Sequence, residues 1–160
     1  MLNNGILFNT QPDKTWIAAH IPHRDDMCLL DRVVAWDEHR LRCVAGSHRL
    51  ADNPLRANDR LSAVCAIEYA AQAMAVHGAL LDAAENTRPR AGMLVSVRET
   101  AIHTLRLDNL AADLDIEVEC IHRNAANILY RFKVQADGKP LADGRAAVIL
   151  DIDPARGIAS

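Results

Sequence analysis

The amino-acid sequence predicts an α+β fold in which an antiparallel β-sheet wraps around one long central helix. Residues 61–85 read LSAVCAIEYAAQAMAVHGALLDAAE, a stretch that is rich in alanine and apolar on most faces, as is typical of a buried helix. Strand-like segments precede this stretch, and a series of alternating segments follows it. A helix that is apolar nearly all round must be covered on most sides, and one sheet wrapped around it satisfies both patterns.

The expected elements follow in order. Residues 1–20 form a weakly patterned lead-in, with one helical turn expected around residues 15–20. Residues 31–47 have the apolar runs and central turn of a β-hairpin. A polar loop that contains Asn-Pro then leads through residues 48–60 into the long helix.

The second half of the chain predicts a meander of strands. The segment NTRPRAG ends the helix, and a strand is expected over residues 93–102. Residues 114–120 alternate strictly between apolar and acidic side chains, which indicates a strand with one face in water. Residues 128–135 also alternate, and Asp137-Gly138 provides a hairpin turn to a last strand that ends near residue 150.

Length and composition favour one globular domain over residues 1–160. Half of the residues are apolar and 24% are charged, and the formal net charge of -3 gives no reason to expect a nucleic-acid partner. The four cysteines lack C-x-x-C spacing, so we expect reduced thiols. The N-terminus does not resemble a signal peptide, and three polar side chains in the long helix argue against a membrane span. The expected location is the cytoplasm.

Two polar side chains in the helix are the main functional clue. Glu68 and Gln72 lie one turn apart and therefore share a face. A carboxylate halfway along an apolar helix is costly to bury without a partner or a function. Glu68 is therefore a candidate catalytic residue, and the alternative is a carboxylate held by structural hydrogen bonds.

Two motifs resemble those of a known enzyme family. The segment PHR at residues 22–24, followed by LLDRV at residues 29–33, resembles the P-H-R-x-x-x-L-L-x-D-R-V opening of FabZ-type 3-hydroxyacyl-acyl-carrier-protein dehydratases. The helix segment EYAAQ at residues 68–72 is similar to their E-A-x-A-Q. The later strands follow the family's order, so the resemblance covers roughly residues 20 to 150 and implies the hotdog fold.

One branch of that family is more similar still. The loop sequence NPLR together with IEYAAQAMAVHGAL in the helix resembles the ApeP-like branch. The resemblance implies a dehydratase of aryl-polyene biosynthesis that acts on intermediates bound to an acyl carrier protein.

The sequence departs from the family in the loop before the helix. The FabZ-type loop is G-H-F-P-G-x-P-x-M-P-G, and its His is the general base. An ungapped alignment from Glu68 backwards places Pro54 at that position. Arg56 stands where hotdog enoyl-CoA hydratases have the His of their N-P-x-H motif.

The resemblance implies an acid and a base for the removal of water from a 3-hydroxyacyl thioester. Glu68 matches the family's acid, and the first turn of its helix supplies N–H groups that polarise the thioester carbonyl. His48, which closes the second strand just before the loop, is the candidate base. Its alternative role is to fix the loop.

The other histidines are expected to have different roles. His77 lies nine residues after Glu68, on the opposite face at about 100° per residue, so we expect a packed or interface residue. Ordinary surface positions are expected for His20, His39, His103 and His122. His23 matches a family position that is not the base, and we expect a structural role in which it organises Arg24 and Asp31 near the tunnel.

The residues expected to bind substrate are Asn53, Arg56, Gln72 and His23. Arg56 and Arg60 are loop cations suited to phosphopantetheine or to an acidic carrier protein, with solvated surface arginine as the alternative. Asn53 before Pro54 has the alternative role of setting the turn. The sequence shows no metal-ligand cluster or Gly-rich phosphate loop, so we expect no cofactor beyond the phosphopantetheine that carries the substrate.

Three functions therefore stand as hypotheses. The first is a 3-hydroxyacyl-acyl-carrier-protein dehydratase that forms trans-2-enoyl thioesters in fatty-acid-like or aryl-polyene biosynthesis. The second is a hotdog acyl thioesterase, in which Glu68 activates water or attacks the thioester. The third is a non-catalytic subunit paired with a complete hotdog dehydratase. Acyl carrier protein is the expected partner, and the expected assembly is a homodimer or higher homo-oligomer, or a hetero-oligomer with a second hotdog dehydratase.

Overall fold

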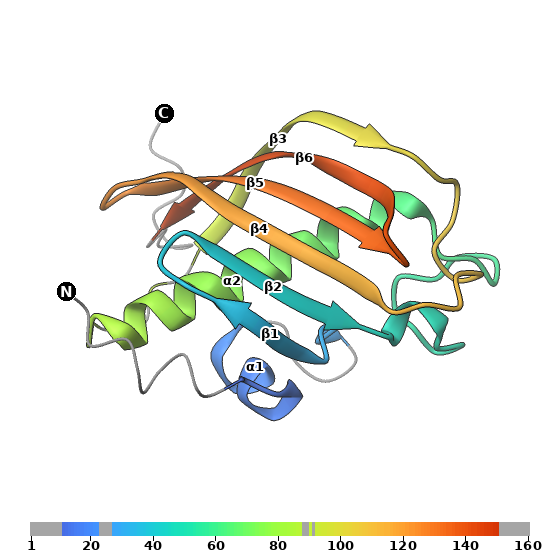
Figure 1. The fold of residues 1–160 in the computed structure, drawn as a ribbon, viewed down its shortest axis with the longest axis horizontal. Helices are drawn as coiled ribbons and strands as arrows, with labels where there is room; N and C mark the ends of the chain where they lie inside the picture. Colours follow the sequence, from blue (N-terminus) through green and yellow to red (C-terminus); the bar gives the residue numbers. More distant parts are fainter. Residues whose placement is uncertain (1–10, 23–26, 88–89, 91, 151–160) are drawn as a thin grey trace.

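The computed structural model describes residues 11–22, 27–87, 90 and 92–150. Six strands form one antiparallel sheet in the order β1-β2-β4-β5-β6-β3, and the sheet curves around the helix α2 (Figure 1). The bounds are α1 (Lys14–His20), β1 (Arg32–Trp36), β2 (Arg40–Ala45), α2 (Ala66–Ala84), β3 (Gly92–Ile102), β4 (Leu114–Arg123), β5 (Asn127–Ala136) and β6 (Lys139–Leu150), with 3-10 turns η2 (Ser47–Arg49) and η3 (Ala63–Cys65). The α+β fold with a central helix is confirmed.

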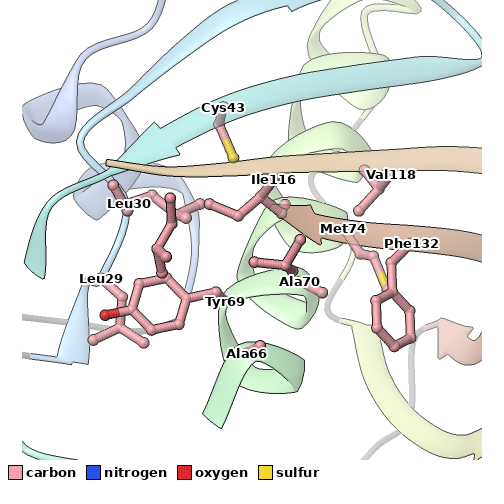
Figure 2. Packing of buried hydrophobic residues seen from close by; sticks show 14 of the residues in the cluster. Leu29, Leu30, Cys43, Ala66, Tyr69, Ala70, Met74, Ile116, Val118 and Phe132 are labelled. Carbon is pink, nitrogen blue, oxygen red and sulfur yellow. The ribbon is translucent and has the colours of Figure 1, made fainter. Parts of the chain in front are cut away.

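The core lies between the concave face of the sheet and α2. The inward residues of β4 are Leu114, Ile116 and Val118, and all three are fully buried. The alternation in the sequence therefore identified the inner face of this strand correctly. Figure 2 shows Ile116 and Val118 directed towards Ala70 and Met74 of α2. The small alanine side chains of the helix let the sheet approach closely, and burial of this apolar surface is the main driving force for the fold.

The long helix begins later than the sequence pattern predicts. Residues 61–62 are extended, because Leu61 exchanges backbone contacts with the segment before β4: its carbonyl accepts from the Leu107 N–H. Ser62 then caps the turn η3, with its side chain accepting from the Val64 N–H at 3.3 Å. Regular α-helix starts at Ala66 and ends at Ala84, with Glu85 as C-cap. The expected start at residue 61 is therefore wrong by five residues, since a pairing distant in sequence holds residues 61–62 extended.

The stretch Ala63–Ala84 is long and apolar enough to cross a membrane, but 56% of its most apolar window is buried inside the protein. The residues that cover it come from the sheet and from the segments around β1. The helix is thus a core element of the described fold.

The two edges of the sheet are covered differently. At the β1 edge, the Val33 N–H donates to the Pro12 carbonyl, and Asp13 bridges to Arg32. β3 pairs with β6 on one side and has no strand partner on its other side among the described residues. Three successive side chains on β3 are exposed by 36% to 45%: Met93, Leu94 and Val95.

His77 is a packed residue, as the sequence predicts. Its side chain is fully buried in α2. Nε2 lies 2.9 Å from the Asp37 carbonyl, so Nε2 donates, and Nδ1 then accepts from the Tyr130 hydroxyl at 2.9 Å. Burial lowers the pKa of His77 to about 4, although the Asp37 carbonyl acts in the opposite direction. The neutral ring therefore joins α2 to β5 and to the β1–β2 turn.

We predict acid destabilisation that depends on His77. The unfolded chain takes up a proton at this residue near the ordinary pKa of 6.5, whereas the folded chain does so near 4. The contribution of neutral His77 to the free energy of unfolding is therefore fully present above pH 6.5. It is lost as pH falls towards 4, and the loss is about 3 kcal/mol at most. Urea unfolding at a series of pH values measures the effect. His77→Gln should lower stability at pH 8 and flatten the dependence between pH 6.5 and 4. An unchanged slope in this variant would contradict the assignment.

Candidate functional site

Glu68 lies in the first turn of α2 and is half-buried. This placement corrects the expectation of a fully buried carboxylate, because one side of the first turn remains open to solvent in the single chain. A carboxylate in the first turn interacts favourably with the positive end of the helix dipole. Its Oε1 lies 3.4 Å from Nε2 of Gln72, so the structure brings together the two helix residues that the sequence singled out.

Gln72 is fully buried and binds the segment before β1. Its Oε1 accepts from the Leu29 N–H at 2.9 Å, and its Nε2 donates to the Met27 carbonyl at 2.6 Å. The amide is therefore occupied by backbone groups. Direct substrate binding by Gln72, expected from the sequence, would require these bonds to be replaced.

Tyr69 forms a buried hydroxyl network beside Glu68. The Ser47 hydroxyl donates to the Leu29 carbonyl at 2.8 Å, so the Tyr69 hydroxyl, 2.7 Å away, donates to Ser47. Nδ2 of Asn53 donates to the Tyr69 oxygen at 3.2 Å. Burial raises the pKa of the Tyr69 phenol, so the hydroxyl stays protonated and keeps this direction. Figure 2 shows the ring against Leu29.

Asn53 has the turn-setting role that the sequence left as an alternative. It is 5% exposed, and its Nδ2 also donates to the Ser47 carbonyl at 2.9 Å. Its Oδ1 accepts from the Leu55 N–H at 2.9 Å, which closes the turn around Pro54. The loop before the helix is therefore fixed by these hydrogen bonds.

His48 lies in η2, directly after β2, and its side chain is fully buried. Nε2 lies 3.1 Å from the Leu110 carbonyl and must donate to it, whereas Nδ1 is buried and has no hydrogen-bonding partner among the described residues. Burial lowers the pKa of His48, while the Leu110 carbonyl raises it. The neutral ring thus carries an available lone pair on Nδ1, but the ring is covered by the chain.

Arg56 and Arg60 occupy a tight loop. The Arg56 guanidinium donates to the Asp59 carbonyl at 3.3 Å and to the Arg49 carbonyl at 3.2 Å, so it holds the loop. Asn58 and Asp59 have positive φ values of 52° and 59°, which form a two-residue turn between Ala57 and Arg60. Arg60 is exposed and remains a loop cation.

The remaining expectations have mixed outcomes. His23 and Arg24 lie outside the described residues. The histidines expected at the surface are exposed: His20 stacks on Trp16 with ring centroids 3.8 Å apart, and His103 lies 2.7 Å from Asp143. All four cysteines are free thiols, of which Cys28 and Cys43 are buried and Cys65 and Cys120 are half-buried. No group of His, Cys, Asp or Glu suited to a metal ion occurs within the described part of the chain.

Two surface hollows among the described residues lie away from Glu68 and His48. One of about 420 Å³ lies on the outer face of the sheet between charged side chains such as Glu119 and Lys133. Another of about 640 Å³ lies past the end of α2, near Arg90 and Arg123. Both cations there are within 4.0 Å of Asp82, so their charge is largely compensated. We place the candidate site at Glu68 on chemical grounds.

Sequence reasoning missed the roles of Tyr69 and Ser47. A tyrosine inside an apolar helix normally needs a partner for its hydroxyl, and this signal was available in EYAAQ. The identity of the partners was not, because Ser47 and Leu29 are 22 and 40 residues away in the chain.

A family model described as ApeP-like, ApeP dehydratase, matches residues 15–156. The chain belongs to the ApeP-like dehydratase family. The match includes the EYAAQ segment that contains Glu68, Tyr69 and Gln72. A search of curated proteins found no match.

Solved structures resemble this ApeP-like protein over most of its length. A chain of the dehydratase heterocomplex ApeI:P from Xenorhabdus doucetiae has a TM-score of 0.76 at 20% identity and covers 87% of this chain and 92% of its own. A mutant thioesterase from Pseudomonas aeruginosa has a TM-score of 0.63 at 15% identity, covering 91% of this chain and 98% of its own. A thioesterase from Haemophilus influenzae has a TM-score of 0.63 at 8% identity, covering 96% of this chain and 100% of its own. At these identities the likeness establishes the hotdog fold.

We predict that Tyr69→Phe lowers the free energy of unfolding by about 1 kcal/mol, because Asn53 and Ser47 each lose one buried partner. Hydrogen exchange should also become faster in residues 47–55. Urea unfolding and exchange mass spectrometry measure the two effects. Tyr130→Phe is the matched control: it removes a buried hydroxyl from the His77 contact and should leave exchange in residues 47–55 unchanged. Equal hydrogen-exchange rates in residues 47–55 of the wild type and Tyr69→Phe would show that the Tyr69 hydroxyl does not hold this loop.

Proposed function

We propose that this protein takes part in the dehydration of 3-hydroxyacyl thioesters carried by an acyl carrier protein. The observation that carries the proposal is Glu68, a half-buried carboxyl in the first turn of the central helix of an ApeP-like dehydratase. A carboxyl in a partly apolar site is suited to protonate the departing hydroxyl. The trans-2-enoyl thioester remains on the carrier, and aryl-polyene or fatty-acid-like biosynthesis, in the cytoplasm, is the proposed setting.

His48 is the base that we propose for a self-contained enzyme. Its Nδ1 carries a lone pair because Nε2 donates to the Leu110 carbonyl. This atom would take the α-proton while the C3–O bond breaks and Glu68 gives its proton to the leaving oxygen. Since the ring is covered by the chain, this role requires the 107–112 segment to open. Arg60 is proposed to contact the carrier or its phosphopantetheine, because it is an exposed cation in the loop that leads into the helix.

The covered position of His48 favours a second candidate function. In this alternative, the chain contributes Glu68 to a site whose base belongs to a second hotdog subunit. The similar ApeI:P structure is a dehydratase heterocomplex, which supports this kind of pairing. The free edge of β3, with Met93, Leu94 and Val95 exposed, supports an assembly of at least two chains joined by their sheets. A strictly monomeric protein in light scattering at micromolar concentration would oppose any two-chain site.

We predict that Glu68→Gln lowers the rate of dehydration at least a hundredfold, because Gln keeps the shape but cannot donate the proton. The assay mixes the protein with a 3-hydroxyacyl carrier-protein thioester and follows the loss of water by mass spectrometry. The matched control is Glu85→Gln at the other end of α2, which should keep wild-type activity. No turnover with any chain length, alone or with a partner dehydratase, would refute the proposal.

The same samples test the thioesterase alternative, in which Glu68 activates water or attacks the thioester and no histidine is needed. Release of free thiol, read with a thiol-reactive dye, would support hydrolysis, because dehydration leaves the thioester intact. Two of the similar structures are thioesterases, but at sequence identities of 15% and 8% the similarity supports only a shared fold.

The origin of the base has its own test. If the chain carries its base, His48→Ala in the isolated protein abolishes dehydration while circular dichroism shows an intact fold. If a second subunit supplies it, His48→Ala has no effect, and Glu68→Gln reduces activity only in the presence of that partner. Exchange of the covered His48 ring proton would identify the opening of the 107–112 segment.

A further inference from the structure

We propose that Gln72 is a positioning residue that holds the segment 27–29 and the Glu68 carboxylate in one fixed arrangement on α2. This inference rests on the proposed function, since it concerns how the same site is kept in order. Gln72 does not need to touch the substrate for this role.

The orientation of the Gln72 amide is fixed by its partners. The Leu29 N–H can only donate and the Met27 carbonyl can only accept, so Oε1 faces the former and Nε2 the latter. The second hydrogen on Nε2 is then available for Oε1 of Glu68, 3.4 Å away. One buried amide therefore contacts both a loop and the candidate acid.

The segment 27–29 depends on side chains for its position. Its residues belong to no strand, and Leu29 has both backbone groups bound by side chains, the N–H by Gln72 and the carbonyl by Ser47. The Cys28 carbonyl accepts from Nζ of Lys14 at 3.1 Å. Since Ser47 is itself held by Tyr69, two neighbouring helix residues, Tyr69 and Gln72, fix the segment beside Glu68.

Glutamine suits this position because it offers a donor and an acceptor at one end of a side chain of the right length. Ionised glutamate at residue 72 has no donor for the Met27 carbonyl, and it places a second negative charge one turn from Glu68. Protonated glutamate restores one donor and one acceptor. Methionine has a similar length but provides neither at any pH.

The test compares Gln72→Glu with Gln72→Met across pH, with activity expressed relative to wild type at the same pH. At pH 8 we expect both variants to lose at least tenfold in kcat. As pH falls towards 5.5, Gln72→Glu should regain at least threefold in relative kcat, because the protonated carboxyl introduced at this position restores the two bonds to Met27 and Leu29. Its single hydrogen leaves none for Glu68, so full recovery is not expected. Gln72→Met should not recover. The other described titratable groups around this arrangement include Cys28, Asp31, Cys65, Tyr69 and Lys14, and all of them are common to every variant.

His77→Gln is the control for stability, because it removes buried hydrogen bonds from the other half of α2. Its relative activity should stay level across the same pH range. A purely structural role for Gln72 predicts that activity follows the folded fraction in every variant, with no recovery specific to Gln72→Glu. That result would overturn the inference.

Hydrogen exchange separates this inference from the proposed function. In wild type the Leu29 amide should be protected, and in Gln72→Met it should exchange at least tenfold faster, whatever the enzyme does. If the wild-type protein forms no enoyl product, the proposed function fails. Hydrogen exchange at Leu29 still tests whether Gln72 holds segment 27–29 in place. Equal protection of Leu29 in both proteins would refute it.

Discussion

The hydrogen bonds of three buried polar side chains on α2 determine how the rest of the chain sits on this helix. Burial of apolar surface stabilises the contact between helix and sheet, but it is non-directional and does not fix rotation or depth. Tyr69 binds Ser47 and Asn53, Gln72 binds Met27 and Leu29, and His77 binds Tyr130 and Asp37. A rotation of the helix would leave several buried polar groups without partners, each at a cost of about 1–3 kcal/mol. These contacts therefore select one arrangement among the many that an apolar helix allows.

This constraint also places the chemistry. Tyr69 and Gln72 face the protein interior, where they form hydrogen bonds with the loops. Glu68 lies beside them at the boundary between the packed helix and solvent. A carboxyl on a rigid helix with fixed neighbours is more accurately placed than one on a loop. The loop before the helix is a structural element, in which Asn53 and Arg56 bind backbone and side-chain groups of the same chain.

The sheet edges connect this arrangement to assembly. The segment before β1 covers one edge through Pro12 and Asp13, whereas β3 presents backbone groups and apolar side chains at the other. An open, apolar strand edge favours pairing with another chain. A site that needs two chains is consistent with a Glu68 side chain that is only half-buried in the single chain.

The sequence by itself determined the α+β fold, the central helix and the inner faces of the strands, because periodicities of 2 and 3.6 residues are local properties of the chain. Residues such as Ile116 and Phe132 could be assigned to the core for this reason, and EYAAQ pointed to Glu68. Only the tertiary structure decided that Leu61 is extended, that Asn53 and Gln72 bind the protein's own backbone, and that His48 is covered by the segment near Leu110. Each of these outcomes depends on a hydrogen bond between polar groups that are brought together by the fold, and a polar group's type does not reveal which distant partner will satisfy it.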